Sequence, residues 1–139
     1  MSYDIYLKDR VGGNVLEFNT PHMMAGGCYQ LGGTKEAWLN VTYNYSPLYR
    51  DVFEPRYFPE HECASEAEDG KPAGYLYGIR SIYGLSGAES IPVLEAAISK
   101  LGDDVSSDYW EATEGNAKSA LCQLLAMAQM RPDGIWDGD

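Results

Sequence analysis

The residues best suited to ligand binding lie in the stretch AWLNVTYNY, from Ala37 to Tyr45. Its pattern predicts a strand, and because the side chains of a strand alternate between two faces, one apolar row should face the core: Leu39, Val41, Tyr43 and Tyr45. The opposite face then carries Trp38, Asn40, Thr42 and Asn44. Asparagine is depleted in strands, because its amide competes with the backbone for hydrogen bonds. An aromatic ring beside two amides can stack on and hydrogen-bond a planar ligand; the alternative is that the amides pair with neighbouring strands or turns.

A second candidate group surrounds the stretch SGAE, which predicts the start of a helix. It comprises Arg80, Tyr83, Ser86 and Glu89. Backbone N–H groups at a helix start can hold an anion, with Arg80 beside them. The alternative, which we favour, is a plain capping box between Ser86 and Glu89. Asn116 and Lys118, in the first turn of a later predicted helix, could add a third contact to such an anion, although capping and solvation explain them as easily.

Catalytic and metal-binding motifs are sparse. An enzyme needs a nucleophile with a base, a metal set or an acid–base pair. The two imidazoles are His22 and His61, and neither has a ligand-spaced partner close by in the sequence. The acidic run with Glu66, Glu68 and Asp69 lacks the spacing of an EF-hand, and no Gly-x-Ser-x-Gly, His-Glu-x-x-His or Walker-type motif occurs. We therefore expect no catalytic residues, no metal site and no cofactor, while a small enzyme acting on nucleotides stays open as a third class of function.

The composition is that of a folded acidic protein. The 139 residues carry a formal net charge of −11, which disfavours direct binding to nucleic acid and favours a basic partner. The three cysteines, Cys28, Cys63 and Cys122, form no Cys-x-x-Cys pair and are interpreted as free thiols. The amino terminus does not have the order of a secretory signal, and no run of about 18 apolar residues occurs, so we expect an intracellular protein without a membrane span. The sequence does not indicate an oligomeric state.

The first third of the chain predicts an antiparallel meander. Residues 3–8 alternate as a half-buried strand, Gly12 to Asn14 offer a tight turn, and a hairpin into VLEF follows. The stretches GGCYQLGG and AWLNVTYNY are two further strand candidates. After them, SPLYRDVF predicts a short helix, with Ser46 as its cap and Pro47 at the first helical position.

The remainder of the chain reads as an acidic segment followed by helices. Residues 54–73 lack periodicity and predict a surface loop or insertion with little buried apolar surface. The stretch GIRSIYG predicts a short helical turn that ends at Gly84, and two longer helices follow. Their expected core stripes are Leu94, Ala97, Ile98 and Leu101 in the first, and Ala117, Leu121, Leu124, Leu125 and Ala128 in the second, which Thr113 caps and Pro132 terminates. We predict a single α+β domain over residues 1–139, in which an N-terminal antiparallel sheet packs against C-terminal helices, with Trp136 docked back onto the body.

Several words of this sequence together resemble a family of small, largely uncharacterised proteins of bacteriophages and prophages. They are AWLNVTYNY, GIRSIYGLSGAESIPVLEAAI, LGDDV, DYWEATEGNAK and MRPDGIWDGD. The resemblance implies a phage or prophage accessory protein in the cytoplasm of a bacterial host, and by analogy a counter-defence role. We expect it to bind a small anionic, nucleotide-like ligand; the alternative is an acidic inhibitor that binds a basic site on a host defence protein.

Overall fold

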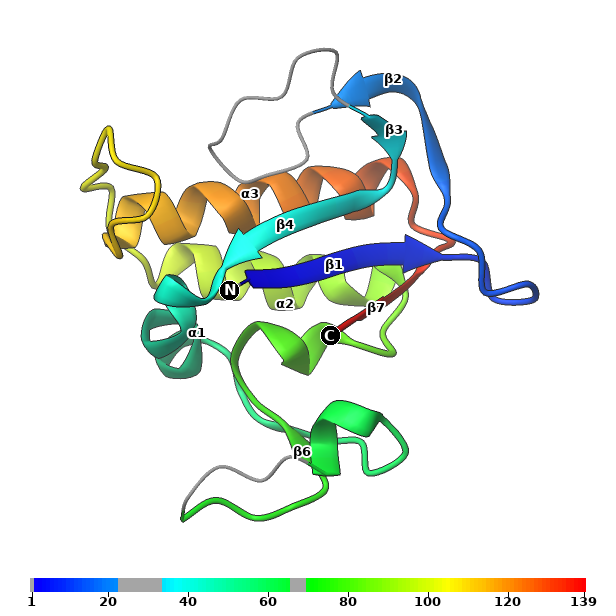
Figure 1. The fold of residues 1–139 in the computed structure, drawn as a ribbon, viewed down its shortest axis with the longest axis horizontal. Coiled ribbons are helices and arrows are strands. Elements are labelled where there is room, and N and C mark those ends of the chain that lie inside the picture. Colours follow the sequence, from blue (N-terminus) through cyan, green and yellow to red (C-terminus); the bar gives the residue numbers. More distant parts are fainter. Residues whose placement is uncertain (1, 23–33, 66–69) are drawn as a thin grey trace.

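A three-stranded antiparallel sheet and two long helices form the centre of the molecule (Figure 1). The computed structural model describes residues 2–22, 34–65 and 70–139. In the sheet, β1 (Ser2–Lys8) lies between β4 (Trp38–Thr42) and β7 (Ile135–Gly138), and both neighbours run antiparallel to it. The predicted α+β class, with N-terminal strands packed against C-terminal helices, is therefore confirmed.

The order of the strands differs from a meander. The turn after β1 closes as expected, because the Leu16 N–H donates to the Leu7 carbonyl at 2.9 Å, but the ladder does not continue. Instead β2 (Glu17–His22) pairs with β3 (Thr34–Glu36), and β4 returns to pair with β1. The strand predicted for GGCYQLGG lies outside the described residues. The carboxyl-terminal β7 pairs with the other edge of β1, and no local sequence pattern predicts this pairing.

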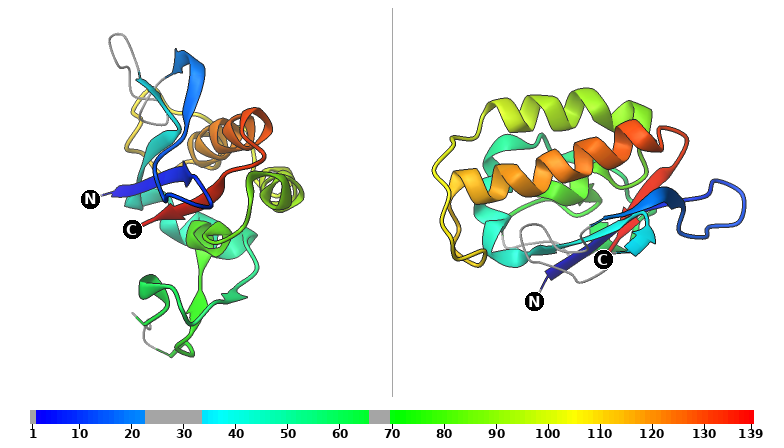
Figure 2. Two further views of the ribbon diagram at one scale, coloured as in Figure 1. Left: turned by 90° about the vertical axis from the view of Figure 1, so that its right-hand side faces the viewer. Right: turned by 90° about the horizontal axis from the view of Figure 1, so that it is seen from above.

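Two capped helices cover the sheet. Helix α2 (Gly87–Ser99) begins with the predicted capping box, and Thr113 caps α3 (Glu114–Met130) by accepting from the Asn116 N–H. Figures 1 and 2 show the two helices running side by side behind the strands. Both predicted stripes face the core: the fully buried members are Leu94, Ala97, Ala117, Leu121, Leu124 and Ala128, whereas Ile98 and Leu125 are partly buried.

The strand that contains Asn40 is shorter than predicted. It ends at Thr42, and the chain turns through a 3₁₀ helix, η1 (Tyr43–Tyr45), into α1 (Ser46–Val52). Thr42 causes the turn, since its hydroxyl accepts from the Asn44 N–H at 3.2 Å and caps η1. The prediction that Tyr43, Asn44 and Tyr45 continue the strand is therefore wrong. Ser46 is the first helical residue rather than the cap, and its hydroxyl bonds to Tyr3 instead.

Residues 54–65 and 70–77 form a small unit beside the sheet, here called the lobe (Figure 1). It contains a two-stranded pair, β5 (Arg56–Tyr57) with β6 (Tyr75–Leu76), and a 3₁₀ helix, η2 (Glu62–Ser65). Another 3₁₀ helix, η3 (Gly78–Ile82), follows the lobe and leads to α2. The described part of the segment predicted as a surface loop or insertion, 54–73, contains short paired strands and a 3₁₀ helix, and long-range hydrogen bonds hold it, as described below.

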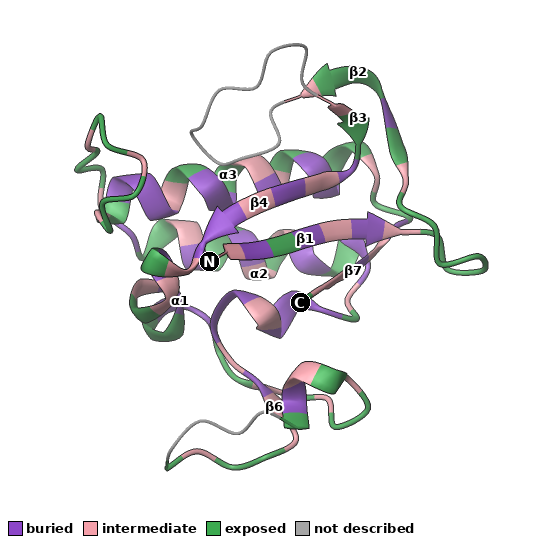
Figure 3. Cartoon of the chain, in the orientation of Figure 1, coloured by how far each residue is buried: buried purple, intermediate pink, exposed green. Residues whose placement is uncertain are grey.

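Buried residues concentrate between the sheet and the helices (Figure 3). Trp136 of β7 is fully buried there, and its indole N–H donates to the Ser90 hydroxyl at 2.7 Å, which confirms the predicted docking of the C-terminal segment. Gly87 permits the start of α2 to approach the end of α3 closely, since a Cβ at that position would lie 2.5 Å from the Arg131 carbonyl. Within the described ranges, none of the helices has the length and apolar character needed to cross a membrane.

Candidate functional site

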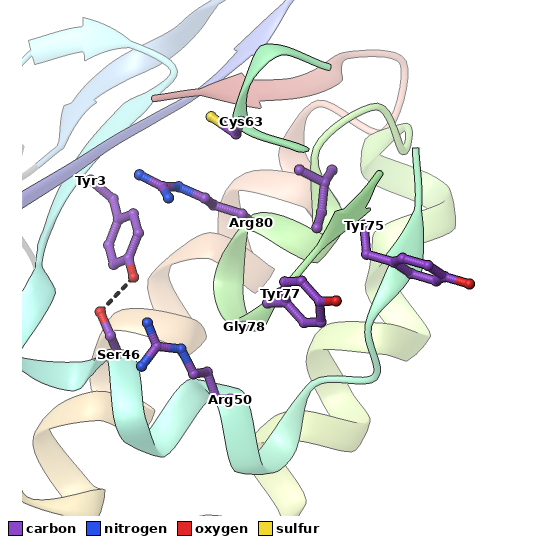
Figure 4. A pocket seen from close by; sticks show the side chains of 9 residues that line it. Tyr3, Ser46, Arg50, Cys63, Tyr75, Tyr77, Gly78 and Arg80 are labelled. Atoms are coloured by element: carbon purple, nitrogen blue, oxygen red, sulfur yellow. Dashed lines mark hydrogen bonds between the residues drawn. The ribbon is translucent and has the colours of Figure 1, made fainter. Parts of the chain in front are cut away.

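A small cavity lies where the sheet, α1, the lobe and η3 meet (Figure 4). Its volume is about 40 Å³. A water molecule needs roughly 10–15 Å³ by this measure, so the cavity has room for a group of a few heavy atoms. The lining residues are Tyr3, Ser46, Arg50, Cys63, Tyr75, Leu76, Tyr77, Gly78 and Arg80.

Two guanidinium groups approach this cavity from different elements. Arg50 extends from α1 and Arg80 from η3, and both side chains reach toward the ring of Tyr3 (Figure 4). Gly78 makes the turn into η3 with a φ of 60°, a left-handed conformation that glycine adopts without strain. In a chain with a net charge of −11, the convergence of two arginines creates a local site for a negative charge.

Arg80 is held firmly in place. Its Nε donates to the Asp139 backbone oxygen at 2.9 Å, and its Nη2 lies 3.4 Å from the Tyr43 hydroxyl. The guanidinium also lies over the rings of Tyr3 and Tyr43, 5.2 and 5.9 Å from their centroids. Burial opposes its charge, but the neighbouring Cys63 and tyrosine groups outweigh that effect and raise the pKa of Arg80. Arg80 is thus a positioned, permanent cation.

Hydroxyl groups form another side of the cavity. Tyr3, from β1, and Ser46, from α1, share a hydrogen bond of 2.5 Å between their oxygens (Figure 4). Each hydroxyl has both donor and acceptor capacity, so the pair can turn one donor toward an anion while keeping its mutual bond. The site therefore places two positive charges beside two hydroxyls, a set of groups that is able to bind an anion.

Tyrosine rings continue outward from the cavity along the lobe. The rings of Tyr75 and Tyr77 lie 6.2 Å apart, and Tyr57, which is 63% exposed, lies 5.1 Å from Tyr75. The Lys71 ammonium lies over the Tyr77 ring at 4.8 Å. The edge of the site therefore offers aromatic surface and a further positive charge.

The predicted strand face does not contribute to this cavity. Trp38 is half-buried on β4 opposite Tyr6, and Thr42 caps η1. The Asn40 amide donates to the Ser2 hydroxyl and the Asp4 carboxylate, at 2.6 and 2.8 Å. The Asn44 amide donates to the Trp110 carbonyl at 2.8 Å. Both amides thus pair with neighbouring segments, which was the alternative interpretation.

The second predicted group, around the start of α2, does not form a single site either. Ser86 and Glu89 form the capping box, in which the bond from the Ser86 N–H lowers the pKa of Glu89. Tyr83 is fully buried beside Arg80, and burial raises its pKa well above the ordinary value. Of the ten residues predicted to bind ligand, Arg80 alone lines the cavity.

Asn116 and Lys118 fix the loop before α3. The Asn116 amide donates to the carbonyls of Asp108 and Glu111, each at 3.0 Å, and accepts from the Ser106 N–H. Lys118 pairs with Asp103 at 2.7 Å. These contacts assign both side chains to the organisation of residues 101–113 rather than to an anion near Arg80.

The histidines occupy structural positions. His61 donates from Nε2 to Asp137 at 2.7 Å, while its Nδ1 accepts from the Cys63 N–H at 3.1 Å. Both ring nitrogens are therefore engaged, and His61 is not placed to activate the Cys63 thiol. His22 bonds through Nε2 to the Glu36 carbonyl oxygen at 2.6 Å. Among the described residues, no group of three or more His, Cys, Asp or Glu side chains is arranged to hold a metal ion.

Comparison with known proteins adds no relative: no family model, no curated protein and no solved structure matches this chain. The site is consequently defined by its geometry. Sequence reasoning missed Tyr3, Ser46, Arg50, Cys63 and Tyr77, because they are far apart in the sequence and each belongs locally to a strand, helix or turn. The one available signal was the rarity of arginine in so acidic a chain.

Proposed function

We propose that this protein binds a small anionic ligand in the cavity between Arg50 and Arg80, as a phage or prophage accessory protein that acts in counter-defence. The observation that carries the proposal is the convergence of two guanidiniums from separate elements on one cavity of a chain with charge −11. The guanidinium of arginine binds carboxylate and phosphate oxygens through two parallel N–H donors. Two arginines at one cavity therefore make a strong anion site.

The size of the cavity limits which part of the ligand it receives. About 40 Å³ accommodates a single phosphate or carboxylate group and not a whole nucleotide. A nucleotide-like ligand accordingly places one phosphate between the arginines and its base against the tyrosines at the edge, Tyr75 and Tyr77. Lys71, above Tyr77, favours a second negative charge there.

A thermal-shift titration with inorganic phosphate, mononucleotides and cyclic nucleotides tests this proposal. Ligand binding to the folded state raises the melting temperature as the concentration exceeds Kd. Arg50→Ala is the sharpest variant, because Arg50 is exposed on α1 and its loss should leave the fold intact. The matched control is Arg10→Ala, which removes the same charge from an exposed turn.

We expect Arg50→Ala to weaken binding about tenfold or more, equivalent to about 1.4 kcal/mol, while Arg10→Ala leaves it unchanged. Arg80→Lys should also weaken binding, since it keeps the charge but loses the planar donor fork. The absence of any shift with all these anions, or equal shifts in wild type and Arg50→Ala, would contradict the proposal.

A second candidate function is inhibition of a basic host protein. The observation that favours it is the segment 103–114, which combines five exposed acidic residues with two exposed apolar side chains. The acidic residues are Asp103, Asp104, Asp108, Glu111 and Glu114. The apolar ones are Val105, 71% exposed, and Trp110, 52% exposed. An exposed tryptophan within a charged rim is a common anchor of protein interfaces.

A pull-down from host lysate at low and high salt separates the two candidates. The Debye length falls from about 10 Å at 0.1 M to about 3 Å at 1 M, so an acidic inhibitor should lose its partner in high salt. Trp110→Ala should abolish that capture and leave a phosphate-induced shift intact. Arg50→Ala should have the opposite pattern.

A further inference from the structure

A second concave site lies along α2. It is on the side of η3 that does not form the cavity between Arg50 and Arg80, here called the arginine cavity. It is an open groove of about 400 Å³ between α2, Leu85 and the segment 52–56. Its lining shares no residue with the arginine cavity. Neighbouring residues of η3 thus serve different sites, since Arg80 lines the cavity and Ser81 lines the groove.

The groove is mostly apolar. Its nonpolar lining consists of Val52, Phe53, Pro55, Leu85, Pro92, Val93 and Ala96. Pro92 and Ala96 lie one turn apart on the exposed side of α2, and Phe53 forms part of the core. Small-molecule sites typically have volumes of about 300–1,000 Å³ and apolar walls with a few placed polar groups, and this groove has those dimensions.

Ser81 lines the groove, but its hydroxyl is not accessible from it. It is 3% exposed, and its hydroxyl is the buried side-chain oxygen that forms no hydrogen bond to any of the described residues. The backbone oxygen of Ser81 is satisfied, because Arg56 Nε donates to it at 2.7 Å. The groups that a ligand in the groove can contact are therefore the apolar lining and the exposed cation of Lys100.

The charges along the groove favour an anion. Arg56 and Lys100 both line it, against the single carboxylate of Glu54. The guanidinium of Arg56 is committed to the Ser81 and Tyr83 carbonyls, while Lys100 is exposed at the carboxyl end of α2. A ligand that pairs with Lys100 and buries its apolar part along Val93 and Phe53 would match both features of the lining.

We infer that this groove is a binding site for a small amphipathic carboxylate, with an apolar body along α2 and its carboxylate at Lys100. The assignment is independent of the anion proposed for the arginine cavity, because the two sites have separate linings. A medium-chain fatty acid has this chemistry, and decanoate is a suitable probe below its micellar concentration.

The first test is a titration of the full chain with decanoate, followed by isothermal calorimetry and by ¹H–¹⁵N NMR shifts. Ala96→Trp fills the groove from an exposed helical position and should weaken binding about tenfold or more. Ser99→Trp adds the same side chain at an exposed position of α2 that does not line the groove, and should leave binding unchanged. Absence of decanoate binding, or equal binding by wild type and Ala96→Trp, would overturn the assignment.

Two further variants test the polar contacts. Ser81→Ala should leave decanoate binding unchanged, since the hydroxyl has almost no surface accessible from the groove. Lys100→Gln should weaken decanoate and not decanol, while Lys35→Gln, exposed on β3, should change neither. Equal affinity of wild type for decanoate and decanol would overturn the carboxylate assignment.

Discussion

The sheet with its helices, called here the body, and the lobe are stabilised in different ways. The body buries a continuous apolar layer from β1, β4, α2, α3 and Trp136. Among the described residues of the lobe, by contrast, the fully buried apolar side chains are Ala64 and Leu76. Polar contacts hold the lobe in place: Arg56 bonds to the Ser81 and Tyr83 carbonyls, and His61 bonds to Asp137. Burial of apolar surface therefore stabilises the body, whereas a few hydrogen bonds hold the lobe.

This difference matters because the arginine cavity lies at the boundary between the two units. Tyr3, Ser46 and Arg50 belong to the body, whereas Cys63, Tyr75 and Tyr77 belong to the lobe. A unit held by few contacts opens at lower free energy than the core does. For the ligand proposed above, this difference predicts entry and release by movement of the lobe while the arginines stay in place.

The largest expected effect is a loss of stability of the body. Trp136→Ala should lower the free energy of unfolding by about 3–5 kcal/mol, because it removes a fully buried indole and leaves a cavity. It also leaves the Ser90 hydroxyl without its donor. Urea denaturation measures the loss.

The matched control is Trp110→Ala, at a side chain that is 52% exposed. Its cost should be below about 1 kcal/mol. Similar losses for the two tryptophans would mean that the C-terminal strand is not part of the core.

The same contrast explains how much the sequence predicted. Helices α2 and α3 follow from apolar spacing, and their caps from Ser86, Glu89 and Thr113, since these signals are local and repeated. Burial of Trp136 was predicted from the cost of exposing it, but its pairing with β1 was not, because pairing depends on contacts more than a hundred residues apart.

The lobe and the arginine cavity were not predictable in this way. Arg56 and His61 lie in a stretch without periodicity, where local composition indicates only a surface loop. Their partners, Ser81 and Asp137, are 25 and 76 residues away. Arg80 was a candidate because of a nearby helix start, a reason unrelated to the partner Arg50 that the fold brings to it.

An intermediate effect is expected from Arg56→Ala, which should destabilise the lobe and leave the stability of the body unchanged. Arg56→Ala leaves the Ser81 and Tyr83 carbonyls without their donor, and bonds to a charged group contribute about 1.5–3 kcal/mol. We expect faster hydrogen exchange in β5, η2 and β6, with protection in α2 and α3 unchanged. Glu54→Ala, at an exposed neighbouring residue, should leave the exchange of the lobe as it is. Uniformly faster exchange in the helices would show that body and lobe unfold as one unit.

The smallest expected effect concerns the link at Asp137, where His61 of the lobe and Lys8 of the body meet, each at 2.7 Å. Burial alone would raise the pKa of Asp137, but the hydrogen bonds from Lys8 and His61 outweigh it and lower the pKa. A carboxyl group with a lowered folded-state pKa stabilises the fold above its unfolded pKa of about 3.9, and this contribution is lost as the pH falls through the folded value.

The wild type should therefore lose more stability between pH 5 and pH 2 than Asp137→Asn does, by on the order of 1 kcal/mol for a partly exposed pair. Asp51→Asn, at an exposed position on α1, should keep the wild-type pH dependence. Asp137 joins the two units. As the pH is lowered, the protection of η2 against hydrogen exchange should therefore be lost before the protection of α3, that is, at a higher pH. Identical pH profiles for wild type and Asp137→Asn would mean that the lobe is held without this carboxylate, leaving Arg56 as its principal attachment.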